Sequence, residues 1–232
     1  MGFFISFQNA TCTSPDILWP SSRFGSSFTT IGNKLFLFGG AFYSHQSSVN
    51  FWKPSMCSNN FTFDIHSSLW SPSPFNFDLE PRVFHHSYYF ADSQSLFIFG
   101  GVKFEDSITY QFNSIHSYNL QSHVLSKHSD SFYMYGGVCL VGILPHTLIF
   151  MGGVNNSQAN KYLFCFDMIS FTLSSKLLPD SVVGEIACGG VQGGKGVVVL
   201  SRRHGNRKVV VVEVEEGGRG GRGGRGGRGG RG

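Results

Sequence analysis

The sequence predicts an all-β protein with a disordered C-terminal tail, and three observations support this prediction. A short apolar run that ends in two glycines occurs three times, as Lys34–Gly40, Ser95–Gly101 and Thr147–Gly153. The double glycines begin 61 and 52 residues apart, a spacing typical of repeats that each hold several strands. No segment shows sustained 3.6-residue periodicity, so we expect almost no helix. The last sixteen residues contain only glycine and arginine.

Composition separates a folded part from this charged tail. Of the 232 residues, 41% are hydrophobic and 15% are aromatic, which is typical of chains that bury a core. The tail holds five of the 18 basic residues, so residues 1–216 carry 13 basic and 14 acidic residues, a balance of −1. The folded part therefore has no general electrostatic preference for nucleic acid.

The cellular location is predicted from cysteines and from apolar runs. No apolar stretch approaches the ~18 residues that a membrane helix needs, and we expect no membrane association. The opening residues also lack the basic region of a secretory signal. The five cysteines are odd in number and widely spaced, which favours a reducing compartment. We predict a cytoplasmic or nuclear protein.

Each repeat is expected to contain about four strands. In the first repeat, a hairpin turns at Gly32-Asn33, a long polar loop follows from Ala41 to Asn60, and two more strands lie at 61–65 and around Leu69-Trp70. Gly-Asn between two β-branched and aromatic runs is a strong hairpin signal. Further strands are expected at 3–7 and 11–14, in a second unit from 81 to 125, in a third from 132 to 173, and in a worn fourth from 184 to 214.

The units share an order of features. A phrase that contains arginine opens the unit, a strand ending in Gly-Gly follows, and then come an aromatic-Asp strand and a tryptophan. The residues that carry this order are Arg23-Phe-Gly-Ser-Ser, Pro81-Arg-Val-Phe-His-His-Ser, Phe63-Asp64, Phe166-Asp167 and Trp70. The order resembles that of kelch repeats. The resemblance covers roughly residues 3–215, although the third copy lacks the opening arginine and the fourth lacks Gly-Gly after Leu200.

The resemblance implies a β-propeller of the galactose oxidase and kelch-like type, in which each blade is a four-stranded antiparallel sheet around a central channel. We therefore predict a kelch-like propeller of about four blades over residues 1–216 and a disordered tail over 217–232. The glycines would lie where the neighbouring blade leaves no room for a Cβ, and aromatic side chains would fill the space between blades.

The number of blades leaves two arrangements open. Kelch propellers usually close with five to seven blades, whereas this chain supplies three whole units and pieces at both ends. The N-terminal strands could complete the fourth blade and close a small ring, which we favour. Otherwise the chain is an arc of a larger propeller, and the strand at 208–214 would be an exposed edge.

The tail resembles the RGG boxes of RNA-binding proteins. Glycine keeps such a segment flexible, while guanidinium groups pair with phosphates and stack on bases. This favours weak contact with single-stranded RNA, and the alternative is a solvated low-complexity tail. The predicted nucleic-acid-binding residues are Arg219, Arg222, Arg225, Arg228 and Arg231.

Other chemistry is disfavoured. Gly189–Gly196 fits most of a phosphate-binding loop, but Gly196 replaces the required Ser or Thr and a strand follows in place of a helix. His85 and His86 are adjacent, so in a strand they point to opposite faces and cannot share a metal ion. Some kelch propellers are copper oxidases or sugar-handling enzymes, but their ligand sets cannot be matched to this chain. We predict no cofactor, no metal site and no enzymatic activity.

The loop from Ala41 to Asn60 is the best functional candidate. It presents Phe42, Tyr43, Phe51 and Trp52 among polar residues, and aromatic side chains on a rigid scaffold form interaction hot spots. The alternative is that Phe51 and Trp52 fold back onto the propeller.

We therefore predict a non-enzymatic protein-interaction module that binds a protein partner of unknown identity on one loop face, with weak RNA contact through the tail. The second hypothesis is an RNA-associated nuclear factor whose main activity is RNA binding through the tail. A kelch-type enzyme is the less favoured third. The sequence does not specify the oligomeric state.

Overall fold

All regular structure in the described part of the chain is β-strand. The computed structural model describes residues 19–46, 51–75, 77–105, 108–132, 135–144, 146–155, 158–178, 185–191, 197–203 and 206–212. No described helix could cross a membrane. The predicted strands at 3–7 and 11–14, and the predicted tail at 217–232, lie outside the described residues.

The strands form four consecutive antiparallel sheets, which we call blades 1 to 4. In blades 1 and 2 the four main strands pair in chain order, as the repeat predicted. Blade 1 consists of β1 (Ser27–Ile31), β2 (Lys34–Phe38), β5 (Phe61–Asp64) and β6 (Leu69–Pro72). Blade 2 consists of β7 (His86–Phe90), β8 (Ser95–Phe99), β11 (Ile115–Asn119) and β12 (Leu125–Ser129).

Blades 3 and 4 continue the same order. Blade 3 consists of β13 (Tyr135–Leu144), β14 (Thr147–Asn155), β16 (Tyr162–Asp167) and β17 (Thr172–Leu177), with the short β15 (Gln158–Ala159) paired to β14. Blade 4 has three strands, β18 (Glu185–Val191), β19 (Val197–Arg203) and β20 (Asn206–Val212). Val191 pairs directly with Val197, so the two strands that flank the glycine-rich segment form an antiparallel pair; the strand predicted after this segment is confirmed, and no helix follows it.

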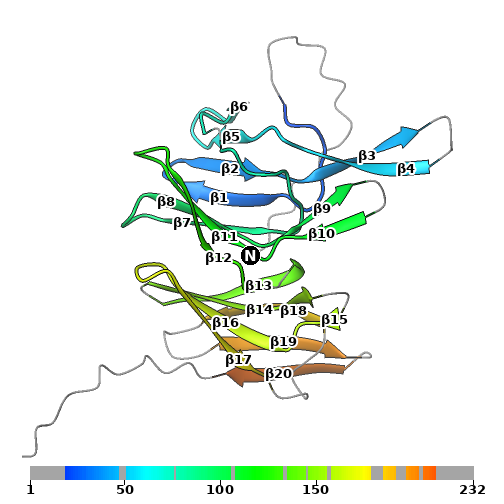
Figure 1. The fold of residues 1–232 in the computed structure, drawn as a ribbon, viewed down its shortest axis with the longest axis vertical. Coiled ribbons are helices and arrows are strands. Elements are labelled where there is room, and N and C mark those ends of the chain that lie inside the picture. The colour runs from blue at the N-terminus through cyan, green and yellow to red at the C-terminus, as the bar shows by residue number, and fades with distance from the viewer. Residues whose placement is uncertain are drawn as a thin grey trace, which may run out of the picture.

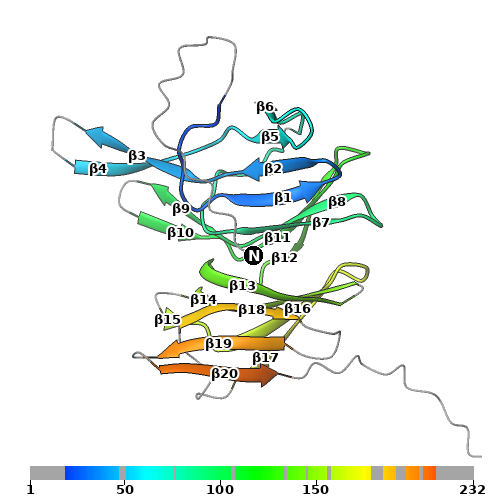
Figure 2. The same cartoon turned by 180° about the vertical axis from the view of Figure 1, so that it is seen from behind.

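The described strands of the four blades form an open series, and the closed ring that we favoured stays a prediction. Figures 1 and 2 show blade 1 at one end of the molecule and blade 4 at the other, with blades 2 and 3 between them. No strand pairing among the described residues joins the first sheet to the last. The N-terminal strands to which we assigned ring closure lie outside the described residues.

The segment that we expected to be a loop from Ala41 to Asn60 contains a β-hairpin, and blade 2 has a second hairpin at the equivalent place. They are inserted between the second and third strands of blades 1 and 2, directly after the double glycine. The hairpins are β3 (Ala41–Gln46) with β4 (Phe51–Met56), and β9 (Val102–Glu105) with β10 (Ile108–Gln111). Pro54 lies within β4, opposite Tyr43, and a two-stranded hairpin tolerates proline because the missing N–H can face its open edge.

The apolar run of each second strand is continuous because the strand is buried on both faces. In β8, Leu96 and Ile98 contact the core between blades 1 and 2, while Phe97 and Phe99 contact the core between blades 2 and 3. This alternation follows the two-residue period of a strand. The rings of Phe99 and Phe150 from blade 3 have centroids 4.6 Å apart. Each such buried ring contributes about 1.5–3 kcal/mol, and the predicted aromatic filling between blades is confirmed.

The double glycine of blade 1 is required by the approach of blade 2. Gly39 and Gly40 have φ of +62° and +94°. A Cβ on Gly39 would lie 2.5 Å from the carbonyl oxygen of Arg82, in the segment that leads into blade 2. The N–H of Gly40 donates to that same oxygen at 2.9 Å. The predicted reason for the glycines, namely the absence of room for a Cβ beside the next blade, is confirmed here.

The acidic residue of each aromatic-Asp strand caps the turn that follows. One side-chain oxygen of Asp64 and of Asp167 accepts two backbone N–H groups of its turn at 2.7–3.0 Å. The turn amides, those of Ser67 and Ser170 foremost, lower the pKa of the two carboxyl groups. In blade 2 the side-chain oxygen of Asn119 likewise accepts two backbone N–H groups of its turn. These polar residues are therefore explained by the fold.

Replacing Gly39 with alanine should destabilise the fold more than replacing Gly32. Both glycines have φ near +60°, so both substitutions place alanine in the left-handed region at a cost of about 1–2 kcal/mol. A Cβ at Gly32 meets no atom within 4 Å, whereas at Gly39 it meets the Arg82 carbonyl. We expect Gly39→Ala to cost about 1–3 kcal/mol more than Gly32→Ala, measured by urea unfolding. Equal losses would show that the contact between blades is not tight.

Candidate functional site

The two inserted hairpins form the most distinctive surface of the described chain. Hairpins β3–β4 and β9–β10 project from blades 1 and 2 on the same side of the molecule (Figures 1 and 2), and β4 lies beside β9. Four aromatic rings follow one another across this region, and we call them the aromatic strip: Tyr43, Phe24, Phe84 and Phe104. Consecutive ring centroids are 4.8, 6.0 and 6.5 Å apart.

Backbone pairing beneath the strip fixes the positions of its rings. Phe24 forms an antiparallel bridge with Ala41, and Val83 forms one with Val102. Ala41, Val83 and Val102 are buried, and Phe24 and Phe104 pack against them. The strip therefore rests on a small core, and its geometry is set by the same strands that carry the double glycines.

The strip is also open to solvent. The exposed fraction is 58% for Tyr43 and 37% for Phe84. Phe42, the neighbour of Tyr43 in β3, is 40% exposed. Exposed aromatic rings that are held on a fixed backbone are the typical anchors of protein interfaces.

Phe84 occupies a backbone position that favours glycine. Its φ is +56°, and the equivalent residue of blade 1 is Gly25, with φ of +66°. The two are equivalent because each follows the residue that bridges to the strand after the double glycine. The Phe84 N–H donates to the Gly25 carbonyl at 2.7 Å, which links the two blades. A left-handed conformation costs a residue with a side chain about 1–2 kcal/mol.

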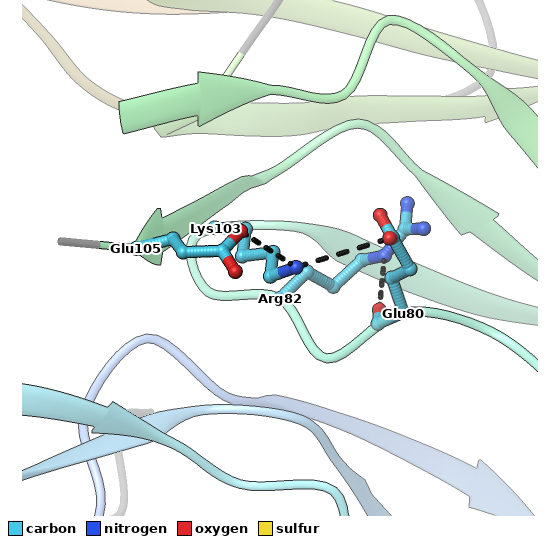
Figure 3. Close-up of polar contacts among 4 residues, drawn as sticks. All are labelled: Glu80, Arg82, Lys103 and Glu105. Carbon is cyan, nitrogen blue, oxygen red and sulfur yellow. Dashed lines mark hydrogen bonds and ion pairs between the residues drawn. The ribbon is translucent and has the colours of Figure 1, made fainter. Parts of the chain in front are cut away.

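A cluster of charged residues extends from Glu80 along strand β9 (Figure 3). Lys103 Nζ lies 3.0 Å from a carboxylate oxygen of Glu105 and 3.9 Å from one of Glu80. The hydrogen bond to Glu105 raises the pKa of Lys103. The Glu80 and Glu105 side chains are 62% and 53% exposed, whereas that of Lys103 is 26% exposed. The cluster therefore presents acidic groups more openly than its one cation.

Arg82 is a buried cation beside this cluster. Its side chain is 1% exposed, and it donates to the carbonyl oxygens of Gly100 at 3.0 Å and Glu80 at 3.3 Å. Its guanidinium carbon lies 4.1 Å from the ring centroid of Phe112. Burial lowers the pKa of Arg82 to about 10, so the group stays protonated at neutral pH and is fully engaged inside the protein.

Arg23 plays the same structural part in blade 1. It donates to the carbonyl of Gly39, the first of the two glycines, at 3.1 Å, as Arg82 does to Gly100. It also donates to the Asn59 carbonyl at 3.0 Å. The opening arginine of each phrase is therefore tied to the double glycine of its own blade and is not a free cation.

The structure brings one of the predicted partner-binding residues into the strip. Tyr43 stacks on Phe24, while Phe42 occupies the alternate position of β3 and so belongs to the other face of the hairpin. In the backbone register Phe51 pairs with Gln46 and Trp52 with His45; the side chains of Phe51 and Trp52 lie outside the description. The arginines at 219, 222, 225, 228 and 231 also fall outside the described residues, so contact with a partner or with RNA stays a prediction.

Sequence reasoning missed Phe24, Phe84 and Phe104. These residues come from three separate segments, and only strand pairing across two blades brings them together. One signal was present in the sequence: in the two opening phrases Phe84 stands where Gly25 stands, and a bulky residue at a glycine position is unusual.

A second polar cluster joins the first strands of blades 1 and 2. The oxygen Oγ of Ser27 lies 2.8 Å from Nε2 of His85 and 2.7 Å from Oγ of Ser87, and Thr29 hydrogen-bonds to Ser87. Ser27, Thr29 and His85 are buried. No carboxylate in the described chain hydrogen-bonds to His85, so the pair lacks the third group that orients a catalytic histidine. We interpret this cluster as a polar seam between blades.

The histidines are spread over several polar contacts. As predicted, His85 and His86 face opposite ways, because His85 bonds to blade 1 while the His86 ring lies against Phe150 of blade 3. His123 contacts the hydroxyl of Tyr118 and His128 that of Ser117. Among the described residues, no group of three His, Cys, Asp or Glu side chains is placed to hold a metal ion.

Comparison with known proteins supports the fold alone. No protein-family model matches the sequence, and no curated protein sequence matches it. The chain resembles the solved structure of YjhT, which has a propeller-like fold, with a TM-score of 0.57 and 14% sequence identity. The similarity covers 77% of this chain and 58% of the YjhT chain, so this chain spans less than two thirds of that protein.

Stability should fall as pH drops from about 6.5 to 4. Burial, reinforced by the Arg82 guanidinium, lowers the pKa of His116 to about 4 and that of His85 well below 6.5. Histidines of the unfolded chain titrate near 6.5, so in this range the unfolded state binds more protons and low pH favours it. Each such histidine contributes up to about 1.4 kcal/mol per pH unit. The measurement is the urea midpoint against pH.

The variant His116→Phe removes one of these titrating groups. We expect its midpoint to fall less steeply between pH 6.5 and 4 than that of the wild type, while both curves are flat from pH 6.5 to 8. An identical slope in the two proteins would show that His116 is not held neutral by its surroundings.

Proposed function

We propose that the chain is a non-enzymatic protein-interaction module, built as a kelch-like propeller, that binds a protein partner through the aromatic strip and through Phe42 on the other face of hairpin β3–β4. The observation that carries this proposal is the row of four rings, partly exposed and anchored by strand pairing at the junction of blades 1 and 2. Because the fold alone does not need an exposed Tyr43 or Phe42, their exposure supports a role in recognition.

The kelch assignment is supported by three features that recur between blades. In blades 1 and 2 the opening arginine donates to the first glycine of its own double glycine, the double glycines have positive φ, and the Asp or Asn that ends the third main strand caps the following turn. These features make the propeller a rigid platform whose copies differ mainly in the inserted hairpins. Recognition would then reside in the hairpins, as it often does in segments that extend from a rigid scaffold.

Substitution of Tyr43 in the strip, or of Phe42 on the other face of the hairpin, should weaken binding of peptide ligands. Ligands would be selected from a displayed random peptide library on the full chain, and their dissociation constants measured for the wild type and for Tyr43→Ser and Phe42→Ser. Truncating a hot-spot aromatic costs at least about 2 kcal/mol, so we expect about 30-fold weaker binding. The matched control is Tyr162→Ser in blade 3, a residue that is 42% exposed. If all three variants bind equally, recognition does not use the strip.

RNA binding through the tail is the second candidate function, and the observation that favours it is the regular spacing of five arginines. On single strands each phosphate contact changes the slope of log K against log salt by about 0.7, so five contacts give a slope of up to about −3.5. We expect residues 1–216 to lose this binding. Equal RNA affinity and equal salt dependence of 1–232 and 1–216 would contradict the role of the tail.

A further inference from the structure

Phe84 of blade 2 has a left-handed backbone conformation that the packing of the blades does not explain. The same position in blade 1 is filled by Gly25, which accepts the left-handed conformation at no steric cost. In blade 2 a phenylalanine is held there, and its ring is still 37% exposed. The ring does bridge Phe24 and Phe104, which makes the strip continuous across two blades. The departure from the glycine of blade 1, together with the place of the ring in the strip, supports a recognition role for Phe84.

Charge around the strip disfavours a polyanion as its ligand. The cations described beside it, Arg23, Arg82 and Lys103, are engaged in internal hydrogen bonds or ion pairs. The openly exposed charges of hairpin β9–β10 and its approach are the carboxylates of Glu80 and Glu105. Ring faces carry negative charge density and attract cations. The surface therefore complements a planar cation with an apolar stem, which describes arginine.

The protein itself shows how a guanidinium and a ring combine in this fold. Arg82 lies over Phe112 at 4.1 Å, and Arg23 lies over Phe61 at 5.4 Å. A glycine-rich chain in the polyproline II conformation turns once every three residues and rises about 3.1 Å per residue, so arginines three residues apart lie on one side of it, about 9 Å apart. Consecutive ring centroids of the strip are 4.8–6.5 Å apart, so successive arginines can reach different rings. Glycines between the arginines carry no side chain that could collide with the rings.

We infer that the aromatic strip binds the arginine-glycine segment Gly217–Gly232 of this same protein, either within one molecule or from a second copy. The inference rests on the proposed function, because it uses the strip as a docking surface. The segment has five arginines at three-residue spacing, which matches the cation chemistry and the ring spacing above. Arginines bound to the strip are unavailable to RNA, and the bound segment blocks the strip to other peptides, so the two activities of the protein exclude one another.

The test uses full-length chains and a labelled peptide with the sequence of residues 217–232. To free the strip, the five tail arginines are changed to glycine, and this tail-neutral chain is titrated with peptide by fluorescence anisotropy. We expect saturable binding that weakens at least tenfold when Phe84→Gly is added. The matched control is Phe171→Gly in blade 3, which also has a left-handed backbone (φ +55°) and is 42% exposed; it should change affinity by less than twofold.

Two further measurements separate recognition from folding and charge. Because Phe84→Gly relieves backbone strain, its melting temperature should equal or exceed that of its parent chain, so lost binding cannot be attributed to unfolding. A peptide with all five arginines replaced by lysine should bind at least fivefold more weakly if guanidinium stacking matters. Equal binding of the two peptides, or undiminished binding by Phe84→Gly, would overturn the inference.

Competition identifies the source of the segment and keeps this inference apart from the proposed function. The wild-type chain should bind the peptide more weakly than the tail-neutral chain, because its own tail competes. If this difference in affinity does not change with protein concentration, the tail docks within one molecule; if the difference grows with protein concentration, the tail comes from a second copy. If library-selected peptides need Tyr43 while the tail peptide does not bind, only this inference fails. If neither depends on the strip, both fail. RNA oligonucleotides that bind the tail-neutral chain through Phe84 would also overturn it.

Discussion

The hydrogen bond from the Gly40 N–H to the Arg82 carbonyl is the contact on which the rest of the structure depends. It brings the end of β2 against the segment that leads into blade 2, at a distance that leaves no space for a Cβ on Gly39. The adjacent hydrogen bond from Phe84 to Gly25 repeats the link in the other direction. With the blades fixed at this edge, Phe36 and Phe38 meet Leu96 and Ile98 to form the core between them.

The same contact also determines where the aromatic strip lies. The double glycine ends the second strand, and the inserted hairpin follows it directly, so the hairpins begin at the junction of two blades. There Phe24 pairs with Ala41 and Val83 with Val102, and the rings of both blades form one row. The surface proposed for recognition is thus a direct product of the packing that stabilises the repeat, and rigid anchoring of its rings lowers the entropic cost of binding.

The sequence predicted the repeat far better than the surface. Strand positions followed from the Gly-Gly phrases because a strand buried on two faces is almost entirely apolar, as β8 is after Ser95. The hairpin β3–β4 was missed because its polar residues and Pro54 are typical of a loop and do not form a recognisable strand pattern. Of the strip, only Tyr43 was named. Phe24, Phe84 and Phe104 are far apart in sequence, and pairing across blades, which a single sequence does not specify, brings them together.

Differences between copies, rather than shared features, carry the functional argument. Arg23 and Arg82, the double glycines and the turn-capping Asp64 and Asp167 recur because the fold uses them, and each has internal partners that account for it. Phe84 replaces the glycine of blade 1 at a left-handed backbone position, which costs conformational energy, and its ring completes a solvent-exposed row. A repeat protein offers its own reference for such a residue: Gly25 shows what the fold requires at that position, so the departure at Phe84 has to be explained by what the ring contacts.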